Sequence, residues 1–299
     1  MSNKTLRASL YFLGAVTALY VLVTLVRSGD EPTTSGLAEA LASIDGQQLT
    51  RIEFASPINR FLLQKEGDGW TVNEYVADTA TVHRLLRAID SAQVREIAAT
   101  NPDHHLDLGV TADSARKMVT DGGVTILFGK HARNRSRTGF LRLPDSDTVH
   151  FVYGDLRYTV GRTLFEWRNK VMLRVDTSVV AAVHVTRDGA TTVYERRDSV
   201  WTVNGEEASA RTVRNTIRDM LQELAEVRAS GFVDEDFETE GEIGSVRALD
   251  ADGNELASLS LSEGSGSHIG STPASPYVFR MPKFRFDRIM PEPPGEDEG

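Results

Sequence analysis

The densest group of positive charges in the sequence is the run from Lys130 to Arg137, which contains Lys130, Arg133, Arg135 and Arg137. Cations at this density can bind a phosphate, a lipid head group or an acidic protein surface. The run lies between two predicted strands, in a loop longer than a turn requires. The alternative is a solvated loop without a ligand. The matching place in the second half, residues 263–270, has no positive run, so the fold does not require these charges.

Other groups of reactive side chains predict no chemistry. Asp103-His104-His105 and Asp107 contain metal-binding residue types, but adjacent histidines do not share a helix face, and a polar loop is favoured. Residues 264–270 are rich in glycine and serine without the spacing of a phosphate loop or a nucleophile elbow. No arrangement of Ser, His and Asp and no carboxylate pair has catalytic spacing. The sequence therefore predicts a protein that is not an enzyme, with no metal and no cofactor.

The elements that would position these residues occur twice. Trp70-Thr71-Val72-Asn73 recurs as Trp201-Thr202-Val203-Asn204, a shift of 201 − 70 = 131 residues. Ala77, Thr81, Val82 and Arg87 are also identical to their counterparts at this shift. An internal repeat of this kind indicates a duplicated module.

Each repeat is predicted to continue into an amphipathic helix. In the first copy Asp78 is expected to cap it, and Val82, Leu85, Leu86 and Ile89 form an apolar stripe at helical spacing. In the second copy Ser209 is the expected cap. A further helix is expected from Leu156 to Trp167, closing the first module.

Composition limits the classes of function. The chain has 299 residues, a formal net charge of −10 and no cysteine. An acidic protein is a poor partner for nucleic acid, because phosphate binding requires a basic surface. The lack of cysteine excludes disulfides, thiolate metal sites and a cysteine nucleophile.

The N-terminal segment has a different character. Residues 8–26 carry no charge and, as a helix, would span about 28 Å, close to one hydrocarbon core. We expect this segment to insert in the cytoplasmic membrane; the alternative is a cleaved signal peptide. The cations at Lys4 and Arg7 predict a cytoplasmic N-terminus and a periplasmic or extracytoplasmic body, as a single-pass protein of the bacterial inner membrane.

The expected fold class is α+β: a transmembrane helix followed by two tandem repeated α+β modules, each a mostly antiparallel sheet with an amphipathic helix packed on it. The expected domains are a transmembrane anchor at 1–28, a linker with a short helix at 29–44, a first repeat at 45–176, a second repeat at 177–290 and a disordered acidic tail at 291–299.

Several short motifs along the chain together resemble the pattern of the bacterial domain-of-unknown-function family 4340, over about residues 45–290. The motifs are Trp70, Val72, Leu108-Gly109-Val110, Phe128-Gly129, Gly139-Phe140 and Trp167-Arg168-Asn169-Lys170. The resemblance implies a relation to auxiliary subunits of ABC-2-type transporters, including those tied to gliding motility. It implies no catalytic residues.

Two functions are therefore expected. The first is a membrane-anchored, non-enzymatic accessory subunit that contacts the permease and ATPase of an ABC-type transporter complex. The second is a module that binds a glycan or lipid head group of the cell envelope through the loop 130–137.

Overall fold

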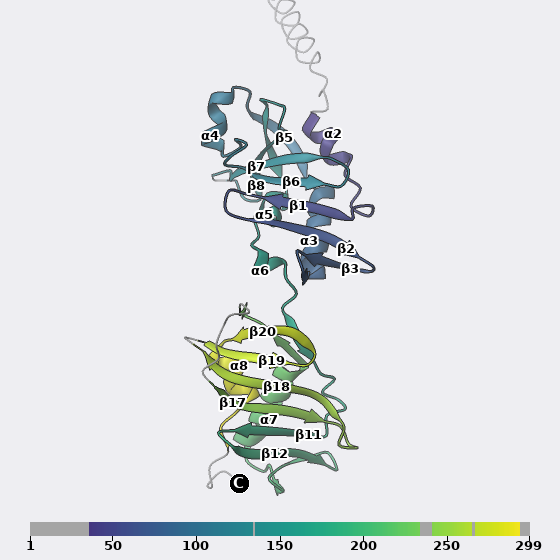
Figure 1. The fold of residues 1–299 in the computed structure, drawn as a ribbon, viewed down its shortest axis with the longest axis vertical. Coiled ribbons are helices and arrows are strands. Elements are labelled where there is room, and N and C mark those ends of the chain that lie inside the picture. Colours follow the sequence, from purple (N-terminus) through teal and green to yellow (C-terminus); the bar gives the residue numbers. More distant parts are fainter. Residues whose placement is uncertain (1–35, 134, 234–240, 265–266, 294–299) are drawn as a thin grey trace, which may run out of the picture. The chain divides into compact units, whose positions relative to one another are not determined.

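The computed structural model describes residues 36–133, 135–233, 241–264 and 267–293. The chain divides into two compact units between Trp167 and Arg168, each with its own sheet and its own hydrophobic core (Figure 1). The sequence placed this boundary after residue 176. The chain changes unit earlier because the Trp167 ring stacks on Phe54 of the first unit, whereas Val171–Arg174 pairs with a strand of the second.

The first unit contains, among its described residues, one antiparallel sheet of nine strands in the order β4-β3-β2-β1-β6-β7-β8-β9-β5. Its strands are β1 (Arg51–Ala55), β2 (Arg60–Glu66), β3 (Gly69–Val72), β4 (Tyr75–Val76), β5 (Gln93–Ala99), β6 (Arg116–Thr120), β7 (Thr125–His131), β8 (Thr138–Arg142) and β9 (Val149–Tyr153). Its helices are α2 (Gly36–Ala42), α3 (Thr79–Asp90), η1 (Pro102–His104), α4 (His105–Leu108), α5 (Leu156–Val160) and α6 (Leu164–Trp167).

The second unit has, in its described part, a nine-stranded antiparallel sheet in the order β14-β13-β12-β11-β17-β18-β19-β20-β16 and a separate pair, β10 with β15. Its strands are β10 (Val171–Arg174), β11 (Ala182–Arg187), β12 (Ala190–Arg197), β13 (Val200–Val203), β14 (Glu206–Glu207), β15 (Glu226–Arg228), β16 (Gly231–Phe232), β17 (Glu242–Leu249), β18 (Glu255–Gly264), β19 (Ser267–Thr272) and β20 (Ser275–Met281). Its helices are α7 (Arg211–Ala225) and α8 (Lys283–Ile289).

The two sheets share one topology. Four strands (β1 to β4, then β11 to β14) lead into a helix, an edge strand follows, and four more strands complete the sheet before a last helical segment. Thus α3 corresponds to α7, and α5 corresponds to α8. The duplication read in the sequence around Trp70 and Trp201 therefore belongs to a duplication of the whole sheet.

The repeated tetrapeptide makes the same hydrogen bonds in both units. Asn73 has a positive φ of 54° and its side-chain oxygen accepts from the Leu62 amide at 2.9 Å; Asn204 has a φ of 51° and accepts from the Val193 amide at 2.9 Å. An asparagine tolerates the left-handed conformation and can accept such a local bond. The motif is therefore a turn that fixes the register of adjacent strands.

The core of each unit lies between the sheet and its long helix. In the first unit Val82, Leu85 and Ile89 of α3 are buried, as the stripe predicts, against Ile52 and Leu63 of the sheet. In the second, Ile217 and Met220 of α7 are among the residues that do the same.

The predicted α+β fold class is wrong, because both units are mostly antiparallel sheet. No helix in the described residues is long and apolar enough to cross a membrane. Short segments such as β4 and β16 were not predicted as strands, because two residues are too few to show alternation. Each is a strand because a neighbouring strand pairs with it. Residues 8–26 lie outside the described residues, and so does the predicted tail from residue 294 onward.

Two helix predictions also change. The N-cap of α7 is Ala210 and not Ser209, so this helix begins one position later than the repeat predicts. The expected helix from Leu156 to Trp167 is two short helices, α5 and α6, separated by Gly161, Arg162 and Thr163.

Candidate functional site

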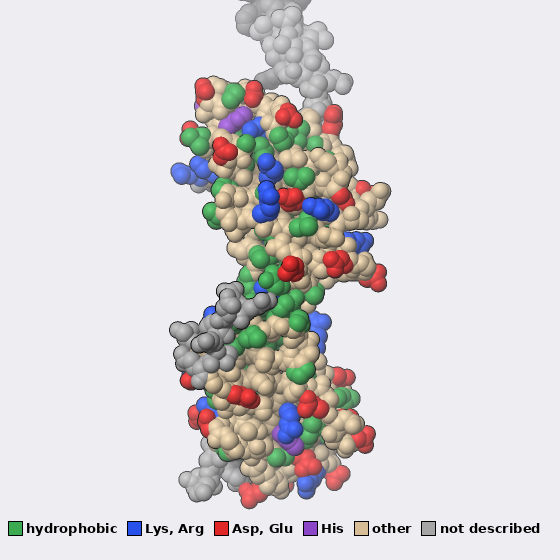
Figure 2. Space-filling view, in the orientation of Figure 1, with side chains coloured by type: hydrophobic (Ala, Val, Ile, Leu, Met, Phe, Trp, Pro, Cys, Tyr) green, Lys and Arg blue, Asp and Glu red, His purple; other side chains and the backbone are tan. Residues whose placement is uncertain are grey.

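The predicted basic residues lie at the end of β7 and in the loop before β8. The Lys130 ammonium donates to the backbone carbonyl of Asp107 at 2.8 Å. Arg133, Arg135 and Arg137 are exposed. Figure 2 shows that basic and acidic side chains are mixed over the face in view.

Arg135 has partners within its own unit. Its guanidinium donates to Glu96 at 2.9 Å and to the Tyr153 hydroxyl at 2.7 Å, and it lies 4.6 Å from the centre of the Phe151 ring. The hydrogen bond that Arg135 donates to Glu96, together with the negative charge of Glu96, raises the pKa of Arg135. This charge is therefore largely matched within the unit.

Arg137 binds Asp155 with two hydrogen bonds of 2.6 and 2.5 Å, the fork geometry that pairs a guanidinium with a carboxylate. Asp155 directly precedes α5. The structure thus brings Arg137 to the edge of a cavity between α3 and α5, and it leaves Arg133 as the loop cation that points to no described partner.

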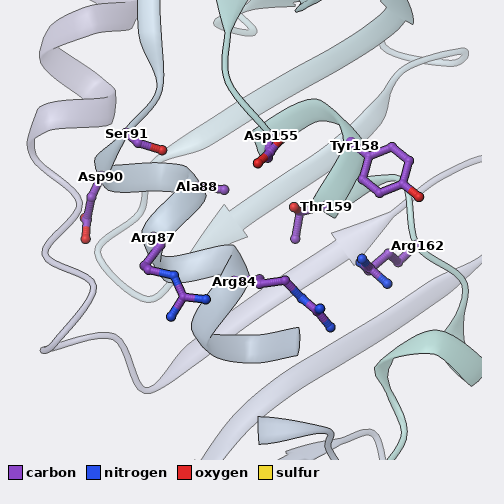
Figure 3. Close-up of a pocket in the computed structure, with 9 residues that line it drawn as sticks. All are labelled: Arg84, Arg87, Ala88, Asp90, Ser91, Asp155, Tyr158, Thr159 and Arg162. Carbon is purple, nitrogen blue, oxygen red and sulfur yellow. The ribbon is translucent and has the colours of Figure 1, made fainter. Parts of the chain in front are cut away.

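That cavity opens between α3 and α5 of the first unit (Figure 3). Its volume is about 580 Å³, which is within the range of small-molecule sites. Its walls come from α3 and the residue after it, from α5, and from one residue on either side of α5, Asp155 and Arg162. The lining residues are Arg84, Arg87, Ala88, Asp90, Ser91, Asp155, Tyr158, Thr159 and Arg162.

Three arginines line this cavity, and their donors are only partly used. The Arg84 guanidinium donates to Thr81 Oγ1 at 2.9 Å, and the Arg87 side chain is exposed. Arg162 lies 3.8 Å from Glu166, and its buried Nε atom has no hydrogen-bond partner. In Figure 3 the side chains of Arg84 and Arg162 extend toward the same side of the space between the helices.

Two further arginines, Arg116 at the start of β6 and Arg157 within α5, bond to backbone carbonyls of the first unit. Arg116 donates to the carbonyls of Val160 and Arg162 at 2.8 and 2.9 Å, and Arg157 donates from Nε to the carbonyl of Gly129. Burial lowers the pKa of both side chains, and the charge of Arg116 lowers the pKa of Arg157 further. Because arginine stays protonated in proteins, and because these bonds go to neutral carbonyls, the two positive charges add to the potential at the cavity.

The glycines of the family motifs make room for this arrangement. A Cβ atom on Gly129 would lie 2.3 Å from the Leu108 carbonyl, and one on Gly139 would lie 2.5 Å from the side chain of Arg157. The motif around Leu108 therefore packs on the motif around Gly129, and the motif at Gly139 admits Arg157. These motif residues hold the fold together and do not line the cavity.

The remaining candidates from the sequence lie elsewhere. His105 is buried, and its Nε2 atom is 2.9 Å from the Asp147 carbonyl, while Asp103 belongs to a short 3-10 helix. Within the described residues no group of His, Asp and Glu could hold a metal ion. Strands β18 and β19 pair with each other, with Gly264 opposite Ser267.

Sequence reasoning missed Arg84, Arg87 and Arg162. The first two were visible as cations three residues apart on the polar face of a predicted helix, and such pairs share one face. Arg162 was hidden because it was assigned to the interior of one continuous helix.

The family profile described as Domain of unknown function (DUF4340) matches residues 70–243. No curated protein matches the chain, and no solved structure matches it. The matched residues include Trp70 and Trp201, so the match extends over parts of both units.

Proposed function

The chain belongs to the family described as Domain of unknown function (DUF4340), as the motifs around Trp70 predict, and from that premise we propose that it is a non-enzymatic interaction subunit that assists an ABC-type transporter complex. The resemblance stated above supports the class of partner. The duplicated scaffold supports a role in binding a partner.

This proposal rests on the residues that the two units have in common and on the surfaces in which they differ. The identical residues Trp70, Val72 and Asn73 and their counterparts form core contacts and turns in both units. The surfaces differ: the basic loop of the first unit has no counterpart in the second. A retained scaffold with divergent surfaces is suited to binding, because function resides in sites placed on a fold.

We assign the partner contact to the exposed loop residue Arg133, which has the freedom to pair with an acidic surface on a permease or ATPase. Charge pairs at the rim of an interface act mainly on the rate and the specificity of association. The alternative, a glycan or lipid head group held by the whole loop 130–137, is less favoured because Lys130, Arg135 and Arg137 already have partners.

The test is co-purification. The tagged full-length chain is isolated from gently solubilised cells, and the proteins that accompany it are identified by mass spectrometry. We expect an ABC permease and its ATPase with the unaltered chain and a reduced yield of both with Arg133→Glu. Arg247→Glu, at an exposed position of β17, is the control for added negative charge. Recovery of the chain without any transporter component would contradict the proposal.

A further inference from the structure

We propose that the cavity between α3 and α5 binds a small anionic sugar, recognised by Arg84, Arg87 and Arg162 through a carboxylate or phosphate group. This site goes beyond the proposed function, because it is separate from the loop residue Arg133 and needs no protein partner.

The first argument is the state of the three guanidinium groups. Arg84 and Arg87 are exposed, Arg162 is half-buried, and all three line the cavity. Their accessible N–H groups can donate to an anion in the cavity, and hydrogen bonds between ionised groups are stronger than neutral ones. The planar guanidinium also matches the two oxygens of a carboxylate or phosphate.

The second argument is charge. The cavity is lined by two carboxylates, those of Asp90 and Asp155, but Arg137 binds Asp155 through both oxygens. Arg116 of β6 and Arg157 of α5 add two further positive charges, and Glu166, 3.8 Å from Arg162, offsets one of the positive charges. In a protein with a net charge of −10 this is a locally positive site, and such a site concentrates anions.

The third argument comes from the second unit, where the corresponding helices are α7 and α8. There Glu223 of α7 is 9% exposed and receives the Arg288 guanidinium at 3.0 Å and that of Arg285 at 3.6 Å. A carboxylate of the chain itself thus occupies the space between the two helices. At the 131-residue shift Glu223 corresponds to Ala92, so the first unit does not supply this carboxylate.

The class of ligand follows from the other walls. The Tyr158 side chain is exposed, and its ring lies 5.6 Å from the Arg162 guanidinium. Such a ring gives a flat apolar surface for the C–H face of a sugar, and the hydroxyls of Ser91 and Thr159 can bond to sugar hydroxyls. A site of this size with an apolar wall and a few polar groups fits a monosaccharide acid or phosphosugar.

The experiment titrates the full-length chain with D-glucuronate, with glucose phosphate and with neutral D-glucose, followed by calorimetry and by amide NMR. We expect saturable binding of at least one anionic sugar, with a Kd of about 1 mM, and resonance shifts around Ser91 and Tyr158. The stronger of the two anions identifies the group that the arginines recognise. Equal binding of glucose would overturn the proposal, and so would the absence of binding by both anions.

The variants are chosen by comparing equivalent positions of the two repeats. Arg84→Asn introduces the residue that the second unit carries at Asn215, and it should weaken binding about tenfold; Arg162→Gln should do the same. Arg218→Gln, at the position in α7 that matches Arg87, is the control and should leave binding unchanged. Unchanged binding by Arg84→Asn and Arg162→Gln, with unfolding midpoints equal to that of the unaltered chain, would exclude this cavity as the site.

Discussion

Asn73 and Asn204 make equivalent hydrogen bonds in the two units. Each accepts a hydrogen bond from the amide of a residue eleven positions earlier, and each returns a backbone bond to the same residue, Leu62 or Val193. Both adopt a positive φ, which costs a residue with a Cβ atom about 1 kcal/mol or more. The pair gives a matched test of one local interaction in two surroundings.

We expect Asn73→Ala and Asn204→Ala each to lower the free energy of unfolding by about 2 kcal/mol, from one lost hydrogen bond and the strained φ. Asn→Gly at the same positions tolerates the φ and should cost less. Urea denaturation measures the differences. Losses near zero for both alanine variants would show that the turns do not depend on these side chains.

Tyr194 is a buried residue with a measurable effect of pH. Its hydroxyl has no described hydrogen-bond partner, and burial raises its pKa to about 12. Because the folded-state pKa lies above the unfolded value of about 10, the stability contribution is complete below pH 10 and is lost as pH rises toward 12, by about 2–3 kcal/mol.

Tyr194→Phe should remove this part of the alkaline loss, so that the unfolding free energies of the two proteins diverge between about pH 10 and pH 12. Guanidinium titrations at several pH values test this. Parallel curves over the whole range would mean that the Tyr194 hydroxyl ionises in the folded state as easily as in the unfolded state.

At the scale of elements, α3 and α7 differ at their first turn. The Asp78 side chain accepts from the Thr81 amide at 2.7 Å, whereas Ala210, which has the same extended conformation, has no side-chain acceptor. Capping residues stabilise a helix because the first amides have no partner within it.

We therefore expect opposite effects at the two caps. Asp78→Ala should destabilise the protein by about 1 kcal/mol, and Ala210→Asp should stabilise it by a similar amount. Thermal unfolding measures both. A destabilising effect of Ala210→Asp would show that this position does not accept the capping geometry, and Ala210→Leu serves as a control for side-chain size.

At the scale of the whole molecule, each unit has its own buried cluster. The first includes Leu85 and Trp167, and the second includes Ile217 and Met220. Units with separate cores are expected to unfold as separate cooperative steps.

Leu85→Ala removes a fully buried side chain from the first core and should cost about 2–5 kcal/mol there. We expect this loss in the fluorescence transition of a variant that retains Trp70 and Trp167, and no change in one that retains Trp201 alone. A single transition shifted equally for both reporters would contradict independent unfolding.

Whether a feature of the fold could be predicted depends on how far apart in the sequence the interacting residues are. The spacing of Val82, Leu85 and Ile89 determined the helix and its buried face, and the match around Trp70 and Trp201 determined the repeat. The motifs around Trp70 also indicated the family. These features depend on residues close in sequence or on identity at a fixed shift, which periodicity and comparison can detect.

Only the tertiary structure determined which charged side chains have a partner within the protein. Arg135 and Glu96 are 39 positions apart, and Arg116 and Val160 are 44 apart, so no local pattern shows that these groups meet. The order of strands in each sheet brings them together, and with them it joins α3 to α5 around a cavity of arginines. The sequence by itself determined which side chains are charged, whereas the long-range pairing of strands determined which charges are matched and which are left to bind a ligand.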